Sequence, residues 1–159
     1  MARDVVVVEG GFAVFDPKLE SPMRSLQMLA AAALLVATAA CGPLKYQVKG
    51  TPQATGADAV ITADVKKDQN LTILEVKAIN LPPPDRVMAG SQHYVAWQRK
   101  NSDTTWNRIA GLTFDADKRT GFLTATVPEL VFELEITAEQ QIGPASPSAE
   151  VVFFQKVGN

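Results

Sequence analysis

An apolar run near the amino terminus limits which part of this chain can fold together. Residues 28–40 are almost entirely apolar, Arg24 places a positive charge shortly before them, and small side chains at 39–40 directly precede Cys41. About 13 helical residues reach only about 20 Å, which is less than the roughly 30 Å hydrocarbon core of a bilayer. The pattern therefore predicts a helical secretory signal over residues 23–40, so that only the residues after it would form the exported protein.

These residues resemble the signal peptide and lipobox of bacterial lipoproteins. In that family a diacylglycerol is attached to the cysteine thiol, a peptidase cuts just before the cysteine, and the new amino terminus is acylated. The resemblance implies cleavage between Ala40 and Cys41 and lipidation of Cys41. The sequence departs from the family at Thr38, where Leu, Val or Ile is preferred. Because Gly42 and not an aspartate follows the cysteine, the resemblance implies sorting to the outer membrane, on its periplasmic face or at the surface.

Two questions about this region stay open in the sequence. The apolar run could instead be a buried helix with Cys41 in the core, although such a helix normally carries polar residues at helical period. Residues 1–22 contain a valine run and a Gly-Gly break that are typical of a hairpin. An export signal ought to begin the chain, so we expect that translation starts at Met23. The alternative is a long n-region that stays in the cytoplasm until cleavage.

The composition favours one small globular domain after the signal. The chain has a net charge of −2, with 47% hydrophobic and 20% charged residues, which is ordinary for a globular protein. About 118 residues follow Cys41, near the commonest size of a single domain. A near-neutral charge argues against nucleic-acid binding, which needs a basic surface. Because Cys41 is the single cysteine, no disulfide can form within the chain, and burial must stabilise the domain.

Turn-forming residues divide the rest of the chain into short segments with strand character. Residues 41–57 are rich in Gly and Pro, and we expect them to form the lipidated cysteine and a flexible tether. Over residues 58–157, alternating apolar and polar side chains indicate about seven strands and no helix, with Trp97 as the anchor of the core. The sequence thus predicts an all-β fold, an antiparallel β-sandwich of immunoglobulin-like or fibronectin-like shape. The segments with strand character are 59–65, 71–79, 93–98, 106–110, 122–127, 130–138 and 151–155, together with the three-residue segment 112–114.

Three successive prolines at 82–84 interrupt this alternation. Proline has no amide donor and cannot take part in a strand ladder as other residues do. The segment over 81–85 is therefore expected to be a rigid connection between the two sheets. The alternative is a ligand for a groove that recognises proline-rich segments.

The domain itself also resembles a known family, over residues 59–157. It is similar to the periplasmic C-terminal sandwich domain of anti-sigma-K factors. The resemblance implies an extracytoplasmic sandwich held near a membrane. It does not imply inhibition of a sigma factor, because no segment here resembles the family's cytoplasmic helical domain or its membrane span. The similar residues are Tyr94 to Trp97, Gly111 and Leu112, Glu135 to Glu139, Pro144, Pro147 and Ser148.

Few residues of the domain suggest catalysis or metal binding. His93 is the single histidine, and no nucleophile-elbow sequence accompanies it. Asp85, Asp115 and Asp117 carry carboxylates but lack the spacing of a calcium loop. Zinc would need a cluster of Cys and His that this composition cannot supply. We therefore expect no catalytic residue, no metal site and no cofactor.

One group of residues suggests binding. Arg99, Lys100, Trp106 and Arg108 are expected to gather at one end of a hairpin as an interaction patch, the alternative being a solvated rim. The leading hypothesis is a lipid-anchored protein of the cell envelope with a non-enzymatic interaction or structural module. Its partners would be the membrane, through lipid on Cys41, and an envelope protein. The alternative is a small-ligand or glycan-binding protein that uses Trp106; an enzyme ranks third.

Overall fold

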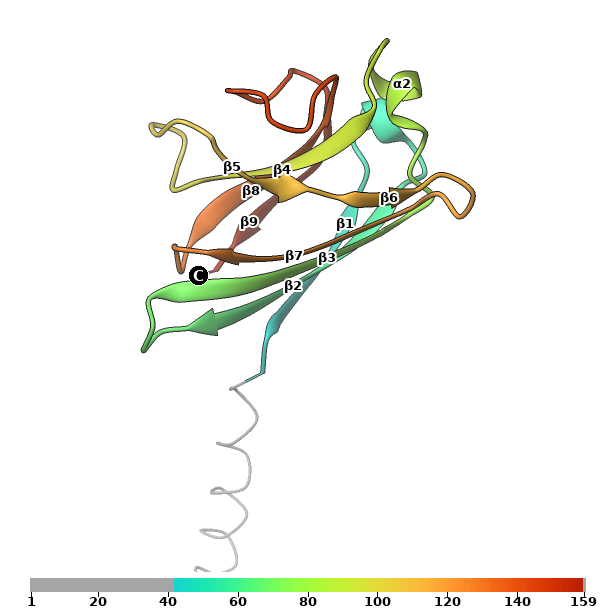
Figure 1. Ribbon diagram of the computed structural model, residues 1–159. Coiled ribbons are helices and arrows are strands. Elements are labelled where there is room, and N and C mark those ends of the chain that lie inside the picture. The colour runs from blue at the N-terminus through green and yellow to red at the C-terminus, as the bar shows by residue number, and fades with distance from the viewer. Residues whose placement is uncertain (1–41, 159) are drawn as a thin grey trace, which may run out of the picture. The chain divides into compact units, whose positions relative to one another are not determined.

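The computed structural model describes residues 42–158, which form two antiparallel β-sheets (Figure 1). The predictions for residues 1–41, including the signal, the cleavage after Ala40 and the lipidation of Cys41, lie outside the described residues. The elements in chain order are β1 (Leu44–Lys49), the 3-10 helix η1 (Pro52–Ala54), β2 (Asp58–Lys66), β3 (Leu71–Ile79), α2 (Pro84–Val87), β4 (His93–Arg99), β5 (Asn107–Gly111), β6 (Thr113–Asp115), β7 (Thr120–Val127), β8 (Phe132–Glu139) and β9 (Val151–Val157).

The strand order is that of an immunoglobulin-like sandwich with one additional strand. Sheet A has the order β1-β2-β3-β7-β6, and sheet B has the order β5-β4-β8-β9. If β1 is set aside, sheet A corresponds to strands A, B, E and D of an immunoglobulin domain, and sheet B to C′, C, F and G. The predicted antiparallel all-β sandwich is therefore confirmed.

The prediction of a flexible tether over residues 41–57 is wrong for Leu44–Lys49, which form the strand β1. β1 pairs with β2 along its whole length, from Leu44 opposite Ala63 to Lys49 opposite Asp58. The hydroxyl of Tyr46 also accepts a hydrogen bond of 3.0 Å from the backbone N–H of Gly158. The segment has period-two alternation, but the neighbouring Gly and Pro residues hide it. Only residues 42–43 separate Cys41 from the first strand.

The connection between β3 and β4 crosses from sheet A to sheet B, as predicted, but it contains the short helix α2. A proline at the first position of α2 is compatible with a helix, because the first amides of a helix have no partner within it. The sequence prediction that the domain has no helix is therefore wrong for Pro84–Val87. Within residues 42–158, no helix is long and apolar enough to cross a membrane.

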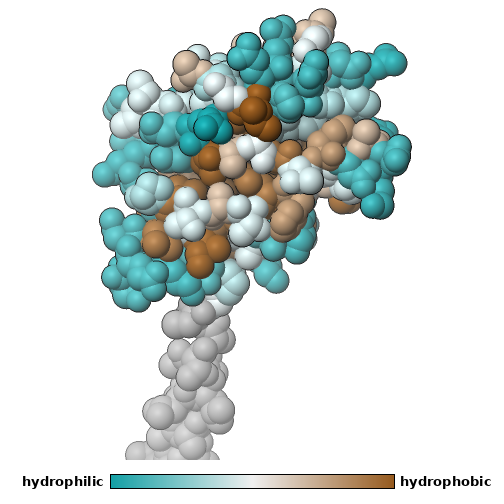
Figure 2. All heavy atoms as spheres, in the orientation of Figure 1, coloured by the Kyte–Doolittle hydropathy of each residue, from teal (hydrophilic) through white to brown (hydrophobic). Residues whose placement is uncertain are grey.

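The main core lies between the two sheets and is built from alternate residues of their strands. Its largest side chains include Tyr94, Phe132 and Phe153, all almost completely buried. The ring of Tyr94 meets Phe114 edge-on at a centroid distance of 5.5 Å, and its hydroxyl donates to the carbonyl of Pro82 at 2.6 Å. The side of the sandwich seen in Figure 2 shows apolar residues across its middle, between hydrophilic margins, where β5, β6 and β7 pass.

Trp97 is completely buried, as predicted, but it does not belong to the core cluster between the two sheets. Tyr94 and Ala96 belong to the core cluster, and side chains alternate along a strand, so Trp97 points to the opposite face of sheet B. Both faces of this part of β4 are apolar. The alternation of side chains along the sequence therefore does not indicate which face meets sheet A. A second buried layer therefore lies on the outside of sheet B.

Candidate functional site

The outer face of sheet B, the face turned away from sheet A, carries most of the buried polar and charged residues among residues 42–158. Such a face is usually solvated, with alternating polar residues exposed. Here Val95, Trp97 and Thr137 are completely buried. Three glutamates of β8 share this face and keep only 5–8% of their surface exposed. The central strands contribute His93, Val95, Trp97 and Arg99 from β4, and Glu133, Glu135, Thr137 and Glu139 from β8.

The connection between β8 and β9, residues 140–150, covers one end of this face (Figure 1). Ile142 lies against Gly111 of β5, where a Cβ atom would come within 2.6 Å of the Ile142 Cδ1 atom. Glycine at this position therefore permits the close approach. The connection is also held at its far end, where the Ser148 hydroxyl donates to the Ala138 carbonyl at 2.9 Å.

A series of hydrogen bonds links Trp97 of β4 to Ser148 in this connection. The indole Nε1 of Trp97 donates to Thr137 Oγ1 at 2.9 Å, and that hydroxyl donates to Glu139 Oε1 at 2.5 Å. The backbone N–H of Ser148 donates to the same carboxylate oxygen at 2.8 Å. Trp97 Nε1, Thr137 Oγ1 and Glu139 Oε1 thus each have a hydrogen-bond partner, which stabilises the position of the Glu139 carboxylate.

The other end of the face is charged and aromatic. Arg99 Nε lies 2.7 Å from Glu133 Oε2, and Lys156 Nζ lies 3.2 Å from the second oxygen of Glu133. The hydrogen bond from Arg99 holds the pKa of Glu133 below its usual value, and Lys156 acts in the same direction. The guanidinium carbon of Arg99 lies 4.3 Å from the ring centroid of Trp106. One arginine therefore joins an ion pair and a cation–π contact.

The structure brings together part of the patch that the sequence suggested. Arg99 and Trp106 are in direct contact, and Arg108 lies opposite Trp97 in the pairing of β5 with β4. Lys100 lies in the connection between these strands and is exposed. Sequence reasoning missed Glu133, which holds Arg99 in place. The available signal was the row of glutamates at alternate positions of β8, a pattern that is typical of a solvated strand face.

The other candidate ligands do not come together. Asp115 forms an ion pair of 2.8 Å with Lys118 in the turn between β6 and β7. His93 lies opposite Glu139 in the pairing of β4 with β8. Among residues 42–158, no group of three or more His, Cys, Asp or Glu side chains could hold a metal ion.

Glu135 differs from its neighbours because it lies between apolar side chains. It is opposite Trp97 on β4 and opposite Phe154 on β9, and no described residue forms an ion pair with it. Burial raises the pKa of Glu135 to about 7, with smaller contributions from Glu139 and Glu133, whereas Arg99 lowers it. The carboxyl group is therefore protonated in the folded protein under mildly acidic conditions.

We expect the substitution Glu135→Gln to stabilise the protein at about pH 8 but not at about pH 5. The folded pKa lies above the unfolded value, so the folded state retains the proton more strongly, and stability is lost as the pH rises through about 7. Glutamine is uncharged at both values and avoids this loss. Denaturant unfolding of wild type and variant at the two pH values measures the difference.

The matched control is Glu75→Gln on sheet A, where Glu75, 37% exposed, and Lys77, 61% exposed, form an ion pair of 2.8 Å. Its effect on the free energy of unfolding should be small and nearly the same at both pH values. A gain for Glu135→Gln that is equally large at pH 5 and pH 8 would contradict the assignment.

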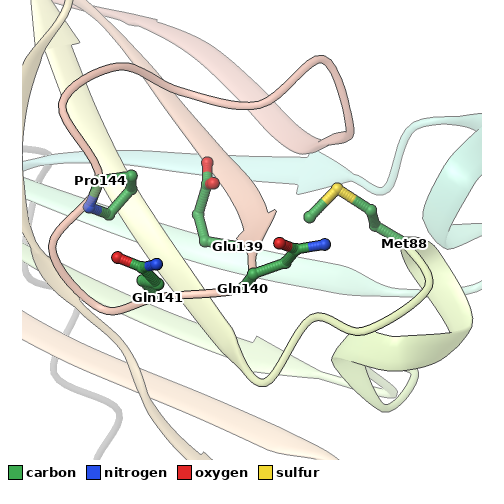
Figure 3. A pocket seen from close by; sticks show the side chains of 5 residues that line it. All are labelled: Met88, Glu139, Gln140, Gln141 and Pro144. Atoms are coloured by element: carbon green, nitrogen blue, oxygen red, sulfur yellow. The ribbon is translucent and has the colours of Figure 1, made fainter.

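A shallow pocket of about 420 Å³ adjoins the buried end of the face (Figure 3). It opens between the connection that follows β8 and the segment after α2. The carboxylate of Glu139 stands in its middle, between Met88 and Pro144 (Figure 3). The lining residues are Met88, Glu139, Gln140, Gln141 and Pro144.

Comparison with models of protein families gave no match, and comparisons with curated proteins and with solved structures gave no significant match. The resemblances of residues 23–41 to a lipoprotein signal and of the domain to anti-sigma-K factors therefore stay predictions. The functional conclusions depend on the chemistry of the residues described above.

Proposed function

We propose that this chain is a lipid-anchored protein of the cell envelope whose sandwich is a non-enzymatic interaction module. The proposed anchor is Cys41, on the evidence of the apolar run before it and the small residues at 39–40. The proposed interaction surface is the charged and aromatic end of the outer face of sheet B. We define this surface by Arg99, Lys100, Trp106 and Arg108.

The observation that carries this proposal is the contact of Arg99 with Trp106 while Arg99 is paired with Glu133. Tryptophan and arginine are the residue types most often found at the energetic centres of protein interfaces. A guanidinium held by an ion pair and a ring loses less conformational entropy on binding than a free side chain. The surface is thus suited to bind a partner without large rearrangement.

The same contacts favour binding over proton transfer. Glu133 is paired with two cations, Arg99 and Lys156, so its pKa is lowered and it stays ionised near neutral pH. A carboxylate in that state is a poor general acid. Its physical effect is to fix the direction of Arg99.

Partner capture tests the proposed surface. The tagged full chain would be cross-linked in native envelope membranes, and captured proteins compared between wild type and a Trp106→Ala, Arg108→Glu double variant. We expect a protein captured with wild type to be lost from the double variant, because both the aromatic contact and the charge complementarity are removed. All variants should remain in the membrane fraction.

The control for this experiment is Lys77→Glu, which makes the same reversal of charge on the outer face of sheet A. It should capture the partner as wild type does. Equal capture by the double variant, with the variant folded, would show that partners bind elsewhere.

A further inference from the structure

The pocket beside Glu139 is chemically distinct from the interaction surface at the other end of sheet B. Among its lining residues only Glu139 is charged. Glu139 keeps only 5% of its surface exposed, and yet no lysine or arginine among residues 42–158 forms an ion pair with it. Among residues 42–158 the only buried side-chain polar atom without a hydrogen-bond partner is Gln98 Oε1. The unbonded oxygen of Glu139 therefore still meets solvent at the pocket, where a cationic ligand can reach it.

The two oxygens of this carboxylate differ in their surroundings. Oε1 accepts hydrogen bonds from the Thr137 hydroxyl and from the Ser148 backbone N–H. Oε2 accepts none from the described residues, so its lone pairs are available. The bonds to Oε1 fix the orientation of the group, which means that a ligand would meet a carboxylate already in position.

The walls of the pocket suit a short alkyl chain that ends in a cation. Met88 and Pro144 supply apolar surface on its two sides (Figure 3). The amide nitrogen of Gln140 lies 3.5 Å from the Ala89 carbonyl. The amide oxygen of Gln140 points toward the middle of the pocket in Figure 3 and adds a second acceptor. An ammonium group donates three hydrogen bonds and accepts none, which matches these acceptors.

We propose that this pocket binds a primary ammonium group, with Glu139 as its counter-ion and Met88 and Pro144 against its methylene groups. The ammonium belongs either to a small free amine or to a lysine side chain. This inference is independent of the lipid anchor and of the surface around Trp106.

The test uses the full chain labelled with ¹³C at its methionine methyl groups, of which the sequence has four. The signal of Met88, identified with a Met88→Leu variant, reports on the pocket. The probes are n-butylammonium, the neutral analogue 1-butanol, and a short capped peptide with one lysine. We expect n-butylammonium to shift the Met88 signal saturably, with a Kd on the order of 1 mM.

The variant Glu139→Gln should weaken this binding about tenfold or more, because the charge is lost while an oxygen that can accept from Ser148 is kept. Glu75→Gln, which removes one charge from sheet A, should bind as wild type does. Saturable binding by both the amine and the peptide would assign the site to lysine side chains, and binding by the amine alone to a small amine.

Three results would overturn the proposal. They are the absence of a saturable shift in the wild-type protein, an equal shift with 1-butanol, or unchanged affinity in the folded Glu139→Gln variant. The first two depend on wild type alone and stay decisive even if the variant does not fold.

Discussion

The substitution Trp97→Ala is expected to destabilise the protein by about 3–5 kcal/mol, a large part of the roughly 5–15 kcal/mol that stabilises a typical domain. Trp97 is completely buried, and its Nε1 atom donates to Thr137. Alanine would leave a cavity on the outer face of sheet B and remove the donor at the start of the hydrogen-bond chain to Glu139. Denaturant or thermal unfolding of the two proteins measures the loss.

Two further variants separate the causes of this effect. Trp97→Phe keeps most of the apolar area but lacks the indole N–H, so the lost hydrogen bond should account for about 1 kcal/mol. Trp106→Ala, at the only other tryptophan, should cost about 1 kcal/mol or less, because Trp106 is only partly buried. If Trp97→Ala were as stable as wild type, the outer face of sheet B would not be a packed layer.

The substitution Cys41→Ser is expected to abolish membrane attachment. In the proposed anchor, lipid on the Cys41 thiol and on the new amino terminus attaches the protein to the membrane. Serine has no thiol to which this lipid could be linked. Each buried methylene contributes about 0.8 kcal/mol, so one acyl chain binds reversibly whereas several bind almost permanently. Attachment should therefore be all or none. Fractionation of envelope membranes and mass measurement of the processed chain check this in the native host.

Wild type should partition with membranes, begin at Cys41 and carry a mass increment on that residue. The control Thr38→Leu, which restores the residue type preferred in lipoboxes, should be processed at least as well as wild type. Wild-type protein found free of membranes with an unmodified thiol would refute the anchor. Mature protein that still carried residues 2–22 would refute both the cleavage and the expected start at Met23.

The strands were predictable because alternation is a local property of the chain. β3 lies at Leu71–Ile79, where the sequence predicts a strand over 71–79, and its residues Leu74, Val76 and Ala78 share the buried face. The strand β1 could not be recognised in the same way. Its six residues are bordered by Gly and Pro, and only the pairing with β2 distinguishes a short strand from a tether.

The candidate site was predictable only in part. Arg99 and Trp106 lie at the two ends of one short hairpin connection, so their approach follows from local sequence. The partners that give the site its properties come from distant segments: Glu133 binds Arg99, and Ser148 fixes Glu139. The pocket beside Met88 likewise needs α2 and the end of β8 to lie close together.

Period-two alternation in the sequence located the strands other than β1 and predicted an antiparallel sandwich, because it gives each strand two distinct faces. Only the tertiary structure decided which of these faces is the core. On β4 both faces are apolar, and Tyr94 meets sheet A whereas Trp97 is completely buried on the outer face of sheet B, opposite Glu135 of β8. The glutamates of β8 have the alternation of a solvated face, yet they are buried. Burial depends on what covers a residue, and the covering groups come from segments that are far away in the sequence.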